Sequence, residues 1–223
     1  NGITNFVSML DNIMVGQVGT DQMSGVSIVN QLLFVYNLCI FGGISGAGIF
    51  TAQFYGQGDH EGVRYTFRFK LMVCALLTIL GLGVFTLFGP QLIELYLHED
   101  NGSGNAAMTL KYAKQYLTVM YFDMIPFAIS QAYAGTLREC DETVLPMKAG
   151  IAAVFVNLVF NYILIYGKFG APALGVTGAA IATVISRFVE MSIIIIWTHR
   201  HTERNRFIVN AYRDFRVPAE LMK

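Results

Sequence analysis

Residues 23–58 read MSGVSIVNQLLFVYNLCIFGGISGAGIFTAQFYGQG and contain no Asp, Glu, Lys or Arg. A helix needs about 20 apolar residues to cross the hydrocarbon core of a bilayer, so this stretch is long enough to span one. Residues 71–93 and 149–167 form two further runs without charge. Such runs in one short chain predict a protein whose helices cross a membrane several times.

The composition agrees with a membrane environment. Hydrophobic residues make up 54% of the chain and charged residues only 13%, whereas an average soluble domain has about 25% charged residues. A soluble alternative would need several long helices that are apolar on every side. None of the uncharged runs alternates polar and apolar residues with period two, as a membrane barrel strand would. We therefore predict an all-α fold, a polytopic transmembrane bundle with six helices over residues 3–19, 26–55, 68–97, 107–137, 145–166 and 174–198.

The positions of Lys and Arg predict how the bundle is oriented. One set follows the second, fourth and sixth predicted helices and comprises Arg64, Arg68, Lys70, Arg138, Lys148, Arg200, Arg204, Arg206, Arg213, Arg216 and Lys223. The opposite set comprises only Lys111, Lys114 and Lys168. Because cytoplasmic loops carry the excess of Lys and Arg, we expect the first side and the N-terminus to be cytoplasmic. The predicted location is the inner membrane of a bacterium.

Other function classes lack the residues that they need. The sequence contains no Walker motif, no recognisable pairing of a nucleophile with a base, and no basic patch interleaved with aromatic residues. The three cysteines lie far apart, and His199 and His201 flank Arg200, which would repel a metal cation. We therefore do not expect an enzyme, a nucleic-acid-binding protein, a zinc site or an organic cofactor.

Small residues recur at four-residue spacing within the first uncharged run. Gly42 is paired in this way with Gly46, and Gly43 with Ala47. Small residues allow membrane helices to approach closely, so the spacing predicts a helix-packing face.

Polar side chains inside the predicted spans are the candidate functional residues, because they are costly in lipid and usually face the bundle interior. Asp11 lies within the apolar stretch FVSMLDNIMVG, residues 6–16. Asn157 and Asn161 are four residues apart and therefore share one face of a helix. The two asparagines either supply ligand oxygens or form hydrogen bonds between helices, and the sequence is compatible with both roles.

Asp123, Arg187 and Glu190 are further charged residues within the predicted spans. Asp123, in YFDMIPFAISQ, either lines a cavity or lies near the outer end of a tilted helix. Arg187 and Glu190 are three residues apart near the basic end of the last helix. We expect these two to form an ion pair rather than a transport site.

Four segments of the chain resemble one transporter family. They are LDNIMVGQVGTDQMSGVSI, GISGAGIFTAQFYGQGDHEGVR, GTLRECDETVLPMKAG and VNLVFNYILIYGKFGAPALGVTGAAIATVISR, and they follow in order over most of the chain. Together they look like the first half of a MATE protein, a multidrug and toxic compound extrusion transporter. The resemblance implies two six-helix lobes that export organic, often cationic, compounds by antiport with sodium ions or protons. Residues 1–198 would then be the N-terminal lobe, and residues 199–223 a basic cytoplasmic connection toward a second lobe.

The resemblance also implies a cation site in this lobe. The family's Asp on the first helix matches Asp11, its polar pair on the fifth helix matches Asn157 and Asn161, and a hydroxyl on the sixth matches Thr183. One branch of the family has Asp where this chain has Asn161, so the coupling ion stays open. A sodium ion would take oxygen ligands from Asp11 and the two asparagines, whereas a proton would neutralise Asp11 alone.

Two other functions remain as alternatives. One is a lipid-linked oligosaccharide flippase of the same fold, which would need a strongly cationic cavity. The other is a membrane interaction protein that transports nothing. The expected partners are small organic substrates, membrane lipid and the second six-helix lobe. Because the chain starts with Asn1 almost at its first helix, we expect the full protein to extend beyond both ends.

Overall fold

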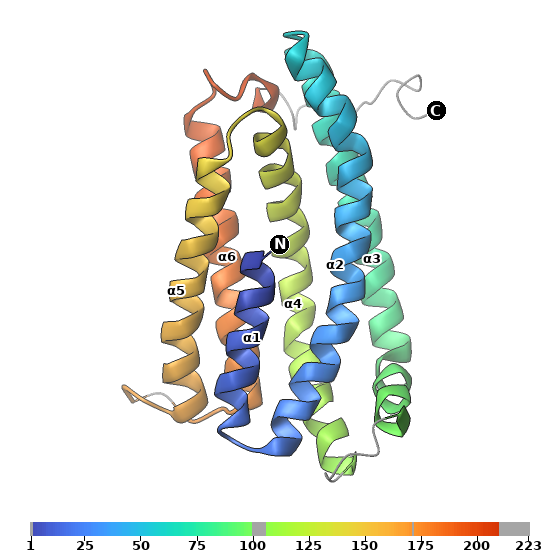
Figure 1. The fold of residues 1–223 in the computed structure, drawn as a ribbon, viewed down its shortest axis with the longest axis vertical. Coiled ribbons are helices and arrows are strands. Elements are labelled where there is room, and N and C mark those ends of the chain that lie inside the picture. The colour runs from blue at the N-terminus through green and yellow to red at the C-terminus, as the bar shows by residue number, and fades with distance from the viewer. Residues whose placement is uncertain (1, 100–105, 171, 210–223) are drawn as a thin grey trace.

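The computed structural model describes residues 2–99, 106–170 and 172–209, and these residues form six α-helices and one 3-10 turn (Figure 1). The elements are α1 (Gly2–Gly16), α2 (Thr20–Gly56), α3 (His60–Glu99), α4 (Ala106–Glu139), α5 (Val144–Tyr166), α6 (Val176–Arg200) and η1 (Arg206–Ile208). The helices run side by side along the long axis of the molecule (Figure 1). The predicted all-α fold with six helices is therefore confirmed.

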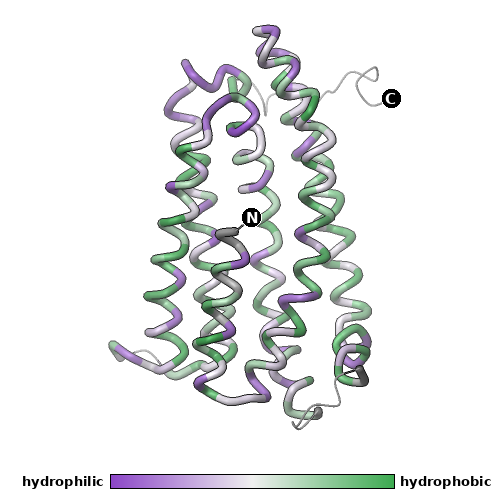
Figure 2. Tube along the Cα trace, viewed as in Figure 1, coloured by the Kyte–Doolittle hydropathy of each residue, from purple (hydrophilic) through white to green (hydrophobic). Residues whose placement is uncertain are grey.

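Four of these helices, α2, α3, α5 and α6, are long and apolar enough to cross a membrane. Figure 2 shows apolar segments along the middle of the bundle and hydrophilic segments toward its ends. On the outward faces, Phe41, Ile79, Leu87 and Phe155 are each more than half exposed. A soluble protein rarely exposes so many large apolar side chains, so the outward faces suit lipid.

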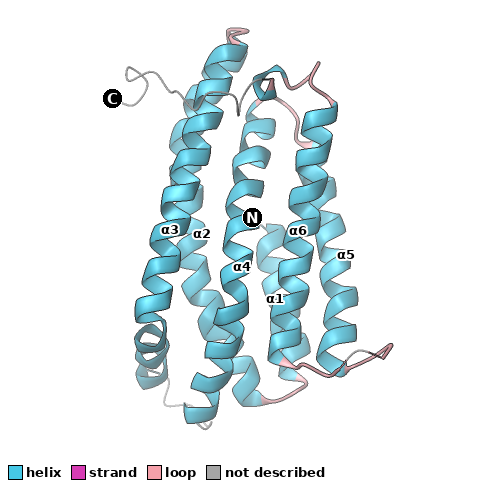
Figure 3. Cartoon of the chain, turned by 180° about the vertical axis from the view of Figure 1, so that it is seen from behind, coloured by secondary structure: helices cyan, strands magenta, loops and turns pink. Residues whose placement is uncertain are grey.

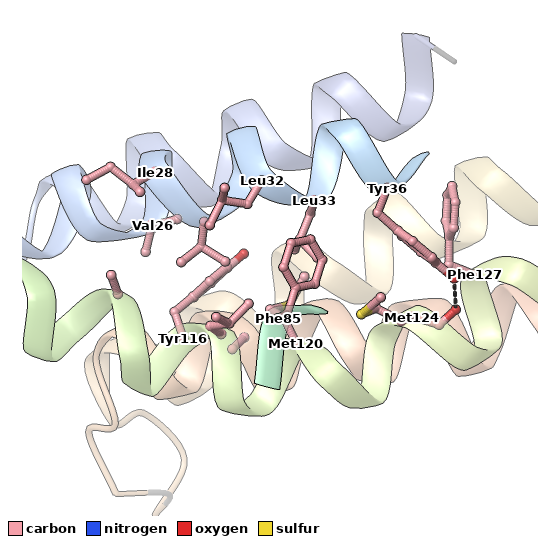
Figure 4. Close-up of a cluster of buried hydrophobic side chains, with 14 of the residues drawn as sticks. Val26, Ile28, Leu32, Leu33, Tyr36, Phe85, Tyr116, Met120, Met124 and Phe127 are labelled. Atoms are coloured by element: carbon pink, nitrogen blue, oxygen red, sulfur yellow. Dashed lines mark hydrogen bonds between the residues drawn. The ribbon is translucent and has the colours of Figure 1, made fainter. Parts of the chain in front are cut away.

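The central helix of the bundle is α4, which packs against α2, α3 and α6. It is the least apolar of the six described helices. Figure 4 shows Leu33 and Tyr36 of α2 facing Met120 and Met124 of α4. The Tyr36 hydroxyl donates to the carbonyl oxygen of Met124 at 3.1 Å and shares a hydrogen bond of 2.8 Å with Thr78 of α3. Because its neighbours cover it, α4 needs fewer apolar residues than a lipid-facing helix.

The start of α3 differs from the prediction by eight residues. The helix begins at His60, because the carboxylate of Asp59 accepts a hydrogen bond of 3.0 Å from the backbone N–H of Gly62. An Asp in this position caps a helix N-terminus. Arg68 and Lys70, which the sequence analysis assigned to the preceding connection, therefore lie inside the helix, and both are buried.

The helix order places the basic connections at one end of the bundle. The turns after α2 and α4 and the end of α6 lie together at the top of Figure 1, whereas the α1–α2 and α5–α6 connections lie at the bottom. Arg200, Arg204 and Lys148 therefore lie at one end of the bundle, as predicted, and Lys168 lies at the opposite end. Which side of the membrane the basic end faces stays a prediction.

The predicted small-residue packing face is confirmed only in part. A Cβ added to Gly43 would lie 2.8 Å from the side chain of Val73, so this position does pack closely against α3. A Cβ added to Gly42 or Gly46 would meet nothing within 4 Å in the described part of the chain. Gly42 and Gly46 lie on the outward side of α2, so close packing at these two positions stays a prediction.

Candidate functional site

Two asparagines on α5 form a buried hydrogen bond. Asn157 and Asn161 have no exposed surface, although α5 is the most apolar of the described helices. The side-chain nitrogen Nδ2 of Asn161 donates to Oδ1 of Asn157 at 2.8 Å. A polar group that leaves water is costly unless it finds a hydrogen-bond partner. The four-residue spacing thus places both amides on one inward face, as the sequence predicts.

Thr183 on α6 contributes a third polar group. Nδ2 of Asn157 donates to Oγ1 of Thr183 at 3.2 Å, and this hydroxyl donates in turn to the backbone oxygen of Ala179 at 3.0 Å. Thr183 is 4% exposed. The structure therefore joins Asn157, Asn161 and Thr183 in one chain of hydrogen bonds between α5 and α6, which we call the amide cluster.

The close approach of α5 and α6 depends on glycine. A Cβ at Gly178 of α6 would lie 2.6 Å from the backbone oxygen of Leu164 on α5, so only a residue without a side chain fits. Gly167 ends α5 in the left-handed conformation, with φ 69°, and its N–H bonds to the carbonyl oxygen of Ile163. A glycine adopts this conformation without strain. These contacts set the spacing at which Asn157 can reach across to α6.

Position 11 lies on α1, but the side chain of Asp11 is outside the described residues. Helix α1 packs against α2, α5 and α6, and it runs in the same direction as α5 (Figure 1). The hydroxyl of Tyr166 ties the two helix ends together, since it lies within hydrogen-bond distance of both the carbonyl oxygen of Met14, at 3.1 Å, and the side-chain oxygen of Gln17, at 2.7 Å. At a rise of about 1.5 Å per residue, the backbone of position 11 lies within about one turn of the depth of Asn161.

Asp123 belongs to a second group of polar residues, between α4 and α6. The Nε atom of Arg187 lies 3.5 Å from Oδ1 of Asp123, and its Nη1 donates to Glu190 at 3.2 Å. The guanidinium also lies over the ring of Phe127, 5.3 Å from its centre. The predicted ion pair between Arg187 and Glu190 is confirmed. We call Asp123, Arg187 and Glu190 the ion cluster.

The position of the ion cluster corrects two expectations. Asp123 is buried near the middle of α4, so it does not lie at the outer end of a tilted helix. Arg187 lies near the middle of α6 rather than at its basic end. Because Arg187 follows Thr183 by four residues, the ion cluster is the neighbour of the amide cluster along α6.

An ion pair between α3 and α4, fully buried on its lysine side, does not follow from the sequence pattern. Lys70 has no exposed surface, and its Nζ contacts the carboxylate of Glu139 and donates to the hydroxyl of Thr136 at 3.1 Å. From the sequence alone, Lys70 indicates only which side of the membrane is cytoplasmic. The capping residue Asp59 was the available signal, because a helix that starts there carries Lys70 into its third turn.

The amide cluster is suited to a hard cation. Amide, hydroxyl and carboxylate oxygens are the ligands that hard cations prefer, whereas thiolate and imidazole suit softer metals. Within the residues that the structure describes, no group of three His, Cys, Asp or Glu is close enough to hold a metal ion. The described amide and hydroxyl groups are neutral, so charge compensation of a bound cation would have to come from a carboxylate nearby.

The sequence of this chain is similar to those of one protein family. The MatE family model matches residues 1–163. The probable multidrug resistance protein NorM of Thermotoga maritima is 30% identical over 194 residues, which cover 87% of this chain and 40% of that protein. NorM of Agrobacterium fabrum is 28% identical over 218 residues, which cover 96% of this chain and 45% of that protein. The chain thus spans less than half the length of these curated relatives.

Solved structures share the fold. A crystal structure of MATE in the bent conformation superposes with a TM-score of 0.80 at 22% identity, over 99% of this chain and 46% of that chain. An outward-facing multidrug resistance MATE family transporter gives a TM-score of 0.73 at 22% identity, over 100% of this chain and 46% of that chain. The six helices therefore correspond to one half of such structures.

Proposed function

Because this chain belongs to the MatE family of transporters, we propose that it forms the first lobe of a secondary transporter that exports organic, often cationic, compounds in exchange for sodium ions or protons. The family consists of transporters and not of enzymes. In this proposal residues 1–198 make up the six-helix lobe, and residues 199–223 lead toward a second lobe. The matched region is less than half the length of each of these relatives, which supports such a second lobe.

The observation that carries the proposal is the buried amide cluster. Three polar side chains from α5 and α6 meet where neither water nor lipid reaches them. Polar residues at such depth in a membrane protein mark ion or substrate pathways. We assign Asn157, Asn161 and Thr183 to a cation site and Asp11 to its charge, since α1 packs against both helices at a similar depth.

The two coupling ions would use this site differently. A sodium ion would need several oxygens at once, from the carboxylate of Asp11 and the amides of Asn157 and Asn161. A proton would need only Asp11, because burial disfavours the charged carboxylate and favours its protonated form. In either case the bound ion neutralises the site, so it competes there with an organic cation.

Competition for one site becomes antiport when access alternates between the two sides of the membrane. A ligand shifts such an equilibrium only through its different affinities for the two states. In secondary transporters the two repeats rock about a site near the middle of the bilayer. The amide cluster lies within about two turns of the midpoints of α5 and α6, toward the connection between them, which is a suitable depth for such a site.

The charges near the site favour an organic cation over an oligosaccharide phosphate. The ion cluster holds two carboxylates, Asp123 and Glu190, against one guanidinium. An excess of negative charge attracts cations and repels phosphate groups. The flippase alternative would require the opposite balance.

The test is Asp11→Asn in the full-length protein, assayed by dye efflux with imposed sodium and pH gradients applied separately. Asn has nearly the size of Asp and retains one oxygen, so α1 should still pack. The loss of charge should abolish coupled efflux under whichever gradient drives the normal protein. Asp141→Asn is the matched control, because Asp141 lies in the turn after α4 with φ 63°, which Asn tolerates.

An equally abundant Asp11→Asn protein that pumps at the normal rate under both gradients would remove Asp11 from the coupling site. The proposal would then have to move to carboxylates in the second lobe. A chain that supports no efflux in its normal form under either gradient would instead favour the membrane interaction protein.

A further inference from the structure

An apolar groove lies along the outer face of α6, outside the proposed cation site. The groove has a volume of about 630 Å³ and is open to the surroundings. Ile185, Phe188, Ser192 and Ile196 line its length, and the last three are exposed. In Figure 3 α6 lies at the front of the bundle, between α4 and α5. The groove therefore opens away from the bundle and not toward the amide cluster.

One end of the groove is cationic. Arg200 and His201, at the C-terminal end of α6, complete its lining, and both are exposed. The neighbouring His199 does not line the groove, and its Nε2 shares a hydrogen bond of 3.3 Å with the hydroxyl of Tyr133. In the described part of the chain, no carboxylate lies within ion-pair distance of Arg200. The guanidinium is thus available to an anion at the mouth of the groove.

An aromatic residue marks the boundary between the apolar and the cationic part. The indole of Trp197 lines the groove and stacks on the imidazole of His201, with ring centres 4.6 Å apart and an angle of 21° between the planes. Tryptophan is enriched where the hydrocarbon core meets the headgroup region. Arg200 and His201 therefore lie at the level of lipid headgroups, and Ile185 at the level of the acyl chains.

The length of the groove fits one lipid leaflet. From Ile185 to His201 the helix rises roughly 24 Å, whereas half of the hydrocarbon core is about 15 Å thick. The groove thus reaches from near the middle of the bilayer into the headgroup region. An acyl chain is apolar and flexible enough to lie along such a groove.

We propose that this groove binds a phospholipid with an anionic headgroup, whose phosphate pairs with Arg200 and whose acyl chain lies against Phe188, Ser192 and Ile196. Charge complementarity selects the headgroup, since a guanidinium holds a phosphate through paired hydrogen bonds. Basic pockets at the ends of membrane helices bind anionic lipids in the same way. The proposal concerns the outer face of α6 and holds independently of the cation site.

Trp197 makes the proposal measurable, because it is the only tryptophan in this chain. The full-length protein, with any tryptophan outside residues 1–223 replaced by phenylalanine, is reconstituted in vesicles of unlabelled phosphatidylcholine. Increasing fractions of brominated phosphatidylglycerol or brominated phosphatidylcholine are then added, and quenching of Trp197 fluorescence is recorded. Brominated phosphatidylglycerol should reach half of its maximal quenching at about one fifth of the mole fraction that the neutral lipid needs, as expected for one cation at the membrane surface.

Three variants test whether the groove is a specific lipid site or whether basic residues at this end of the bundle attract anionic lipid in general. Arg200→Gln should abolish the preference for phosphatidylglycerol, whereas Arg204→Gln, an exposed cation in the following turn that does not line the groove, should retain it. Ser192→Phe should fill the groove and lower quenching by both brominated lipids. Ser192 is exposed, so this change leaves the packing of the bundle intact.

Three results would overturn the proposal. Equal quenching by the two lipids would mean that the groove does not select an anion. Equal loss in the Arg200 and Arg204 variants would mean that the basic end attracts lipid as a whole. Absence of quenching by either lipid would mean that protein, such as a second copy or the second lobe, covers this face of α6.

Discussion

Asn157 is the residue on which the amide cluster depends. It accepts a hydrogen bond from Asn161 and donates one to Thr183, so it links α5 to α6. The spacing of the two asparagines within an uncharged run was enough to predict their common inward face. The contact with Thr183, 26 residues further along the chain, could be suggested only by the family resemblance, because no local pattern encodes it.

Replacing Asn157 with Leu should lower transport while leaving the protein in the membrane. An apolar residue makes insertion of α5 easier, whereas the loss of the amide removes one ligand oxygen from the proposed cation site. We expect efflux to fall at least tenfold, corresponding to about 1.4 kcal/mol. Efflux and membrane abundance are measured in parallel. Phe155→Leu, on the lipid-facing side of the same helix, is the control and should behave normally.

If the Asn157→Leu protein disappears from the membrane while the control persists, the asparagines serve packing between helices. The assignment of a cation site to these residues would then be wrong, although their hydrogen bonds would still link α5 to α6.

Arg187 shows the limit of local sequence patterns. Its pairing with Glu190 follows from a three-residue spacing and was predicted, whereas its contact with Asp123 joins α6 to α4. The second contact depends on how these helices pack, which a single sequence does not reveal. The partner of Asp123 was therefore missed, even though Asp123 itself was identified as unusual.

At the scale of whole helices, the α5–α6 contact should be sensitive to one methyl group. Gly178→Ala would bring a Cβ to 2.6 Å from the backbone oxygen of Leu164, which cannot move aside as a side chain can. Overpacking of this kind costs about 1 to 3 kcal/mol. Thermal unfolding in detergent measures the loss. Gly42→Ala, where the added Cβ meets nothing within 4 Å among the described residues, should be neutral or stabilising.

A normal unfolding temperature for Gly178→Ala would show that the two helices can separate without penalty. In that case glycine would not be what sets the distance across which Asn157 bonds to Thr183.

The pair of Lys70 and Glu139 should stabilise the packing of α3 on α4. Lys70→Met leaves the partly exposed carboxylate of Glu139 without its cation, and we expect a loss of about 1 to 3 kcal/mol, less than for a fully buried pair. The double variant Lys70→Met with Glu139→Gln removes both charges and should recover most of the lost thermal stability. Lys148→Met, an exposed lysine near the start of α5, is the control and should unfold at the normal temperature.

Equal stability of the single and double variants would contradict a direct interaction between the two charges. The start of α3 is the reason that the sequence does not indicate this pair, because charged residues before a long apolar run are typical of a connection as well as of a helix end.

For the whole molecule, the clustering of basic connections predicts which end faces the cytoplasm. A membrane-impermeant maleimide applied to intact cells should label Lys168→Cys in the α5–α6 connection. Gln57→Cys, in the turn after α2, should react only after the cells are permeabilised. Both positions are exposed, so access across the membrane is the only difference between them. The reverse labelling pattern would contradict the predicted orientation.

We expect the native Cys140, which is partly exposed, to react slowly in this measurement. Burial raises the pKa of its thiol to about 12. The thiolate is the reactive form, so at neutral pH the group stays protonated and reacts slowly, and its labelling should increase only as the pH rises toward that value. Cys39, which is exposed, is replaced by Ala in all variants.

The central position of α4 has a consequence for how the chain is made. A nascent helix enters the bilayer from the translocon according to its own hydropathy, and α4 is the least apolar of the described helices. Since α2 and α3 precede it, two of its three main neighbours are already synthesised when α4 emerges. We expect α4 to be retained poorly when synthesised alone and to be inserted efficiently behind α2 and α3, so that biogenesis of this lobe is cooperative and depends on the order of its helices.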